Sequence, residues 1–161
     1  TEVTMHENSY METEMVQIKG VDSTQRMTKA DLAAGAKLII RERLLTHGDQ
    51  HAESGFVVNL NGEDSSANVI SRSVAKNNST QVFNAEINGN AKCAGHSECD
   101  AIIMDHAKIS AIPKIVANDI DAALIHEAAI GKIAGEQLIK LMTLGLTEQE
   151  AEAQIVNGFL K

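Results

Sequence analysis

The chain has 161 residues and a formal net charge of −8 at pH 7. A chain of this length predicts one domain with a core large enough to fold alone. The negative charge argues against sequence-independent binding to nucleic acid or to an anionic membrane, because both are polyanions. Three Phe, one Tyr and no Trp are present, so Ile, Leu, Val, Ala and Met must fill the core.

The cysteine content and the lack of a targeting segment predict the compartment. Two cysteines do not make a disulfide framework, so we expect the reducing cytoplasm. The sequence has neither a signal peptide nor an apolar run that could span a membrane, and we expect a soluble protein. It begins at Thr1 without an initiator methionine, which suggests a fragment of a longer protein.

Most of the chain, from Val3 to about Leu124, has the pattern of many short β-strands. The segments are rich in β-branched residues, and clusters of Gly, Asn, Asp and Ser separate them. Because Pro113 is the only proline, we expect Gly and Asn to form the turns in left-handed conformations. The clearest strands are residues 37–41, 55–60, 67–71, 81–83 and 101–104.

Short strands about ten residues apart, with few aromatic residues, fit either a β-sandwich or a parallel β-helix. A β-helix stacks like side chains on successive coils, which favours small branched residues inside. The sequence has no strict repeat, so its periodicity leaves both folds open.

Two short helices are predicted after His126. Apolar residues recur at helical spacing over 133–142, and Gly145 is expected to follow the first helix as its C′ residue. A capping box over 147–150 opens the second helix. The apolar face of this second helix is expected to contain Ala151, Ile155 and Phe159.

The helices are predicted to form a small hairpin without a flexible linker to the β region. Two short helices bury little apolar area alone, so the hairpin must pack on the β region or on a partner. We therefore divide the chain into a β domain over 1–127 and a helical segment over 128–161.

The segment 95–100 (GHSECD), together with His126 and Glu127, is the richest cluster of chemically active residues. Sulfur and imidazole nitrogen are ligand atoms for transition metals. Cys93 and Cys99 stand six residues apart and form no CxxC pair, which excludes a self-contained zinc finger. A site here has to be assembled by the fold or shared with another subunit.

Four segments occur in order along the chain: ECDAIIMD (98–105), the strand at Pro113, LIHEAAIGKI (124–133) and GLTEQEAEAQIVNGF (145–159). Together they resemble the C-terminal portion of the SufB/SufD family, whose members are scaffolds for iron–sulfur cluster assembly. The resemblance covers roughly residues 36–161. Its Cys-Asp and His-Glu pairs are more similar to the B-type scaffold subunit than to the D-type. It implies an all-β fold, a right-handed parallel β-helix with a small C-terminal helical hairpin.

The resemblance also implies roles for three residues. Cys99 matches the cysteine that accepts sulfur and helps to build the nascent cluster. His126 and Glu127 match the pair implicated in holding iron near the subunit interface. Imidazole and carboxylate both ligate iron, and a cluster that must later leave benefits from ligands weaker than thiolate.

Residue chemistry alone favours plainer interpretations of the same residues. The acids on both sides of Cys99 disfavour its thiolate, so a buried structural thiol is the simpler reading. His126 and Glu127 would then occupy a turn between a strand and the hairpin. The chain also departs from the B-type pattern, since Ala107, Val116 and Ile125 stand where a cysteine, a glutamate and an acid are common.

The remaining cysteine and histidines are weaker candidates. Cys93 matches no family motif and is expected to be a small buried hydrophobic residue. His96 precedes Cys99 by three residues and could lie beside it or in a solvated loop. The other histidines, which we expect at the surface, are His6, His47, His51 and His106.

The sequence thus predicts a non-enzymatic scaffold subunit of a SUF-type system that holds a nascent iron–sulfur cluster transiently. Its expected partners are a SufC-type ABC ATPase docked on the C-terminal helices, a sulfur donor system, and a second copy or a SufB/SufD homologue. The alternative is a D-like structural subunit that docks the ATPase and a scaffold partner without holding the cluster.

Other activities find no support in the motifs. No phosphate-binding loop is present, so we expect this chain to bind no nucleotide. A nucleophile elbow and a zinc-protease His-Glu motif are also lacking. A β-helical carbohydrate-acting enzyme needs paired carboxylates and usually aromatic platforms for sugar rings, and this aromatic-poor chain offers no such platform.

Overall fold

The computed structural model describes all residues from 1 to 161 and contains ten strands followed by two helices. The strands are β1 (Glu2–Met5), β2 (Tyr10–Gln17), β3 (Ser23–Leu32), β4 (Lys37–Thr46), β5 (His51–Leu60), β6 (Ser66–Ala75), β7 (Thr80–Gly89), β8 (Ala94–Ile103), β9 (Lys108–Ala117) and β10 (Ala123–Gly131). The helices are α1 (Gly135–Thr143) and α2 (Glu148–Phe159).

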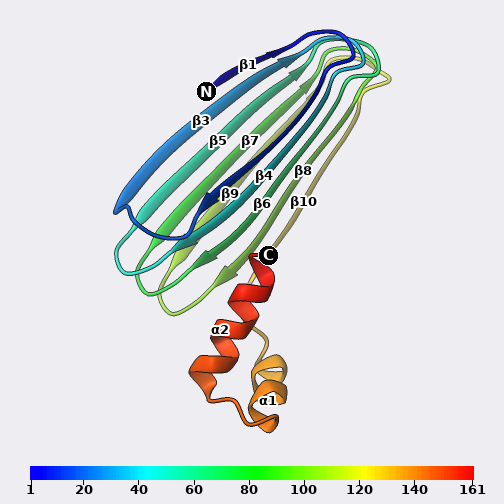
Figure 1. The fold of residues 1–161 in the computed structure, drawn as a ribbon. Coiled ribbons are helices and arrows are strands. Elements are labelled where there is room, and N and C mark those ends of the chain that lie inside the picture. Colours follow the sequence, from blue (N-terminus) through cyan, green and yellow to red (C-terminus); the bar gives the residue numbers. More distant parts are fainter.

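The strands form two parallel sheets that face each other (Figure 1). One sheet has the order β1-β3-β5-β7-β9 and the other has the order β10-β8-β6-β4-β2, so consecutive strands alternate between the sheets. This winding is a parallel β-helix, which confirms the predicted fold class. The β-helix runs from Glu2, where β1 begins, to Gly131, where β10 ends.

One coil of the β-helix contains 28 or 29 residues over its central part. Lys37 pairs with Ser66, and Ser66 pairs with Ala94. Residues this far apart in sequence therefore lie on neighbouring strands, about 4.8 Å apart. Motifs separated by one coil length are brought side by side.

The turns use left-handed backbone conformations, as predicted from the single proline. Gly48, Asn77 and Asp105 all have positive φ angles and occupy equivalent positions on successive coils. Stacked hydrogen bonds join them, since the Gly48 amide donates to Asn77 Oδ1 at 3.0 Å and the Asn77 amide donates to Asp105 Oδ2 at 2.8 Å. Asp supplies this conformation as well as Gly and Asn, because its short side chain tolerates the left-handed region.

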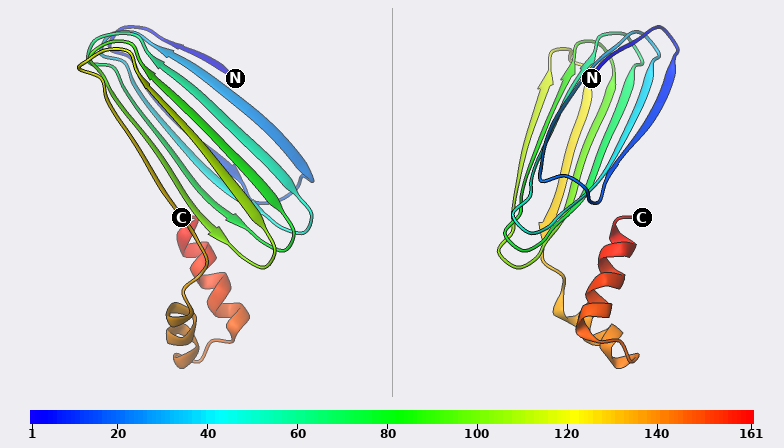
Figure 2. Two further views of the ribbon diagram at one scale, coloured as in Figure 1. Left: turned by 180° about the vertical axis from the view of Figure 1, so that it is seen from behind. Right: turned by 60° about the vertical axis from the view of Figure 1, so that its left-hand side comes forward.

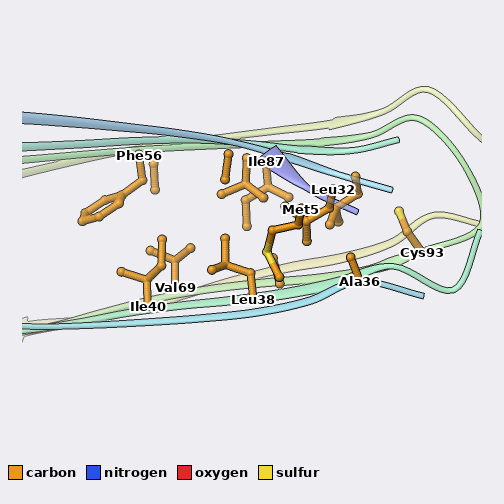
Figure 3. Packing of buried hydrophobic residues seen from close by; sticks show 14 of the residues in the cluster. Met5, Leu32, Ala36, Leu38, Ile40, Phe56, Val69, Ile87 and Cys93 are labelled. Atoms are coloured by element: carbon orange, nitrogen blue, oxygen red, sulfur yellow. The ribbon is translucent and has the colours of Figure 1, made fainter. Parts of the chain in front are cut away.

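The core lies between the two sheets and consists mainly of aliphatic side chains (Figure 3). Along the central strands every second residue is buried, which is the two-residue alternation of a β-strand. Phe56 and Phe83 stack on successive coils with ring centroids 5.8 Å apart. Cys93 lies at the edge of this cluster, near a turn, and is buried, as the sequence predicted.

One charged side chain is enclosed within the β-helix. The Glu42 carboxylate accepts hydrogen bonds from Ser54, from Ser71 at 2.9 Å and from Arg26 Nη2 at 2.9 Å. A buried charge is tolerated only when it is paired and hydrogen-bonded, and these donors meet that condition. The core therefore changes from apolar to polar along the length of the strands.

The helical hairpin projects beyond one end of the strands, next to the turns that follow β6 and β8 (Figure 2). The last turn of α2 anchors it there through a small apolar cluster of Val74, Met104, Val156 and Leu160. The predicted apolar face of α2 is only partly correct. Ala151 is fully buried, but Val156 and Leu160 are more buried than Ile155 and Phe159.

Both predicted helix signals are confirmed. Gly145 has a φ of 97° directly after the C-cap Leu144, and its amide donates to the Met142 carbonyl. Thr147 and Glu150 form the capping box that begins α2. Neither helix is long and apolar enough to cross a membrane.

Candidate functional site

The two motifs singled out in the sequence lie on adjacent parallel strands, β8 and β10. Glu127 is directly opposite Glu98, Ala128 is opposite Cys99, and His126 is opposite Ser97. Their separation in sequence equals one coil, so stacking of the coils brings them together. The strand predicted over 101–104 begins earlier, at Ala94, so Cys99 lies in the middle of β8.

Alternation along the strands divides these side chains between two faces. Ser97 and Cys99 point between the sheets and are buried, whereas His96 and Glu98 lie on the outer face. On β10, His126 is opposite Ser97 and faces inward, whereas Glu127 is opposite Glu98 and faces outward. His126 and Glu127 therefore do not converge on one point within a single chain.

Cys99 is the most enclosed of the candidate residues, with 1% of its surface exposed. Burial raises the pKa of its thiol to about 11, and the carboxylates of Asp100 and Glu42 add to the shift. Glu42, Ser71 and Cys99 occupy one inward row on three successive strands of the same sheet. The thiol is thus protonated at neutral pH and lies at the end of a polar row inside the β-helix.

His126 is a diagonal neighbour of Cys99 on the same inward face. Its Nδ1 atom is buried and has no hydrogen-bond partner. A buried polar atom without a partner is costly, and it indicates a place where a proton, a ligand or another chain can bind. Because β10 is the outermost strand of its sheet, no further coil covers the interior beside His126.

The outward side chains form a separate cluster. One ligand atom from each of His96, Glu98 and Glu127 lies within 4.8 Å of the others. His96 Nε2 is 3.3 Å from Glu127 Oε2, and His96 Nδ1 is 3.0 Å from Asn68 Oδ1. Burial raises the pKa of Glu98, and the pKa is raised further by the hydrogen bond that protonated Glu98 donates to Asp100 and by the charge of Asp100.

Cys93 and the remaining histidines lie away from both clusters. Cys93 is a buried core residue in the turn before β8, and burial raises the pKa of its thiol. His96 neither contacts Cys99 through its outward side chain nor lies in a loop. The other histidines are exposed, as predicted: His6, His47, His51 and His106.

A family model described as SUF system FeS cluster assembly, SufBD core domain, matches residues 1–159. The chain belongs to the SufBD family. The match covers almost the whole β-helix and hairpin, so the family assignment made from four short motifs is confirmed.

Curated SufBD proteins from archaea give the same result. An iron–sulfur cluster assembly SufBD family protein of Methanothermobacter thermautotrophicus is 35% identical over 127 residues, which is 78% of this chain and 31% of the relative. Its counterpart from Methanocaldococcus jannaschii is 41% identical over 105 residues, 65% of this chain and 33% of the relative. One from Pyrococcus horikoshii is 38% identical over 120 residues, 73% of this chain and 27% of the relative. The chain spans about a third of the length of the SufBD relatives it matches.

Sequence reasoning on this SufBD chain missed the outward cluster. From the sequence, His96 is expected beside Cys99 or in a solvated loop, and Glu98 is only an acid that flanks the thiol. A signal was available, because His96 and Glu98 are two residues apart and Glu127 follows Glu98 by one coil length. That signal becomes visible only once β8 is recognised as a strand and the coil length is known.

Proposed function

We propose that this chain is a scaffold subunit for iron–sulfur cluster assembly, with Cys99 as the sulfur acceptor. The observation that carries the proposal is the pairing of a thiol and an imidazole, Cys99 and His126, on one inward face beside the uncovered last coil. Thiolate and imidazole are both suitable ligands for iron. The cluster is cargo rather than a resident cofactor, and the chain itself catalyses no turnover reaction.

Sulfur transfer to Cys99 requires its thiolate. The thiolate attacks the outer sulfur of a protein persulfide donor, a new S–S bond forms at Cys99, and the donor leaves as its thiolate. The electron count is unchanged overall, since the sulfane sulfur only moves between thiols. Because the Cys99 pKa is about 11 in the closed chain, the step needs a base or a local opening of the last coil. The proposed base is His126, a diagonal neighbour on the inward face.

His126 and Glu127 supply iron ligands from opposite faces of β10. As the outermost strand of its sheet, β10 has a free edge, so a second subunit docked on that edge reaches both faces. We therefore place cluster assembly at a contact with a second copy or a SufB/SufD homologue. The exposed apolar residues Ile112 and Ile115 of β9 and Ile125 and Ile130 of β10 support such a contact.

The helical hairpin is proposed to dock a SufC-type ABC ATPase. Its helix α1 buries no residue and exposes Ile139, Met142 and Leu144, the last at 77%. A hollow of about 390 Å³ lies between the helices, lined by Leu141, Leu144 and Ile155 with two polar neighbours. Apolar surface of this kind on a projecting element is typical of a protein-docking site.

Anaerobic reconstitution with ferrous iron and sulfide tests the scaffold role, read by visible absorbance and Mössbauer spectra. We expect Cys99→Ala to abolish cluster formation and the matched variant Cys93→Ala to form clusters normally. Both thiols are buried, so the comparison separates a chemical role from a packing role. Cluster formation by Cys99→Ala at the wild-type rate would make this chain a D-like structural partner.

The D-like alternative has one observation in its favour, the deep burial of Cys99. A thiol with 1% exposure serves equally well as a packing residue. In that case a homologous scaffold subunit would carry the sulfur acceptor and hold the cluster, and this chain would contribute the subunit contact and the docking hairpin. The same reconstitution, repeated with a B-type partner subunit present, would then show cluster formation that does not depend on Cys99.

A further inference from the structure

The outer face of the β8–β10 ladder carries three metal-ligating side chains, on the opposite side of the sheet from Cys99. His96 and Glu98 are two residues apart on β8 and therefore share a face, and Glu127 is directly opposite Glu98 on β10. Their ligand atoms lie within 4.8 Å of one another. The hydrogen-bonded ladder fixes the backbone of both strands, so the three donors share one small region of the outer face.

The orientation of His96 is set by a neighbour on the next strand. Asn68 Oδ1 lies 3.0 Å from His96 Nδ1, and an amide oxygen can only accept a hydrogen bond, so Nδ1 carries the proton. In the neutral imidazole, the protonated Nδ1 leaves Nε2 with a free lone pair on the side of Glu127. A hydrogen bond that fixes the tautomer and the ring of a histidine is the usual support of a metal-ligating imidazole.

The spacing between His96 and Glu127 suits a shared cation. Nε2 and the Glu127 carboxylate oxygen are 3.3 Å apart, longer than the roughly 2.7–2.9 Å of a charge-assisted hydrogen bond. Two ligand atoms bound at about 2.1 Å to one ion, at angles near 90–109°, lie about 3.0–3.4 Å apart. Two lone-pair donors at this separation need either a proton or a metal ion between them.

The surrounding charge also favours a cation. Glu98, Asp100 and Glu127 gather on this part of the outer face, and Arg72 is the cation that acts on Glu98. Neighbouring carboxylates of like charge repel one another, and a bound cation would relieve that repulsion. The Glu127 side chain is 66% exposed and that of His96 is 30% exposed, so an ion can enter directly from solvent.

We propose that His96, Glu98 and Glu127 form a divalent transition-metal site on the outer face of β8 and β10, and that the ion it takes in the cell is ferrous iron. One imidazole and two carboxylates suit Fe²⁺, Co²⁺, Mn²⁺ or Zn²⁺, whereas Ca²⁺ needs six to eight oxygens and Cu⁺ prefers sulfur. The choice of iron rests on the proposed assembly function. The metal site itself rests only on the geometry of the three side chains.

This site separates iron from sulfur within one chain. The thiol of Cys99 lies on the inner face of β8, and Glu98 next to it lies on the outer face with the ion. Three protein ligands leave further positions for water or for groups of a second subunit.

Titration of the metal-free 161-residue chain with CoCl₂ tests the proposal, followed by the visible d–d absorption of Co²⁺. We expect one equivalent to bind. His96→Gln and Glu127→Gln should each weaken Co²⁺ binding at least tenfold, and Asn68→Ala should weaken it by about tenfold through loss of the supporting hydrogen bond. The exposed-histidine control His106→Gln should bind as the wild type does.

Three results would overturn the site: no Co²⁺ binding by the wild type, unchanged Co²⁺ affinity in His96→Gln, or an equal loss in His106→Gln. An imidazolium–carboxylate ion pair alone would appear as no Co²⁺ binding by the wild type. Circular dichroism melts of the variants control for folding, and all three ligands have partly exposed side chains. Anaerobic calorimetry with Fe²⁺ then repeats the series with iron. Since Cys99→Ala should keep its Co²⁺ site while losing cluster formation, failure of the metal site and failure of the scaffold role are distinguishable.

Discussion

His126 and Glu127 are neighbours in the chain, yet their side chains lie on opposite faces of β10. His126 continues the inward row of Ser97, beside the buried thiol of Cys99. Glu127 continues the outward row of Glu98, and its carboxylate meets His96. A His-Glu pair in a strand therefore serves two different environments, unlike the same pair on a loop, which can turn both side chains to one ion.

The burial of the two thiols predicts their reactivity. At pH 8 the folded chain should react with Ellman's reagent far more slowly than a free thiol, and Cys99 more slowly than Cys93. The pKa of Cys99, about 11 against an ordinary 9.0, alone lowers its thiolate fraction roughly a hundredfold. The labelling rate of Cys99 should keep rising as the pH approaches 11, whereas the rate of an ordinary thiol levels off near pH 9. Fast labelling of Cys99 without denaturant would mean that the last coil opens readily.

The close stacking of the turns predicts a severe effect at Gly62. A Cβ atom at this position would overlap the backbone of Ala33 and Ala34 on the previous coil. Gly62→Ala should therefore lower the free energy of unfolding by about 3 kcal/mol, measured by chemical denaturation. Gly158→Ala is the matched control, because nothing lies within 4 Å of its added methyl group and it should stabilise α2 by up to about 1 kcal/mol. Equal stability of the two variants would contradict the observed coil contact.

The uncovered last coil predicts self-association or pairing with a homologue. Ile115 faces the interior from β9 but is 39% exposed, because no further coil covers it. Light scattering should show a dimer for the wild-type chain, and Ile115→Lys should weaken the dimer more than tenfold by burying a charge in the contact. Ile139→Lys, at an exposed position of α1, should leave the dimer intact. A wild-type chain that stays monomeric at high protein concentration would exclude a homodimer, but it would not exclude a heterodimer with a homologue.

The acids of α2 are predicted to lie in the ATPase contact. Charge reversal at Glu148 and Glu152 should weaken binding of a SufC-type ATPase, measured by calorimetry, with only a small change in the thermal melt. That change is not zero, because Glu148 is in the first turn of α2, where a positive charge opposes the helix dipole. The control Glu7→Lys with Glu63→Lys makes the same change in net charge at exposed positions of the β-helix. Equal ATPase affinity in both double variants would exclude these acids from the contact.

Local features of the fold are readable in the sequence because they depend on neighbouring residues. The capping box of Thr147 and Glu150 and the C′ residue Gly145 are set by backbone groups three or four positions away. The turn residues Asn77 and Asp105 take left-handed conformations for equally local reasons. Short apolar strands are also visible, but the choice between a sandwich and a β-helix came from the family resemblance and not from periodicity.

The tertiary structure alone decided which residues meet. Segment 94–100 has few β-branched residues and looks like a loop, yet it is a strand because β6 and β10 pair with it on both sides. The coil length, 28 or 29 residues here, then decides that Glu98 meets Glu127 and that His96 lies against Asn68. Strand alternation finally assigns Cys99 to the inside and Glu127 to the outside. These contacts join residues about 30 positions apart, and no local preference of the chain encodes such a distance.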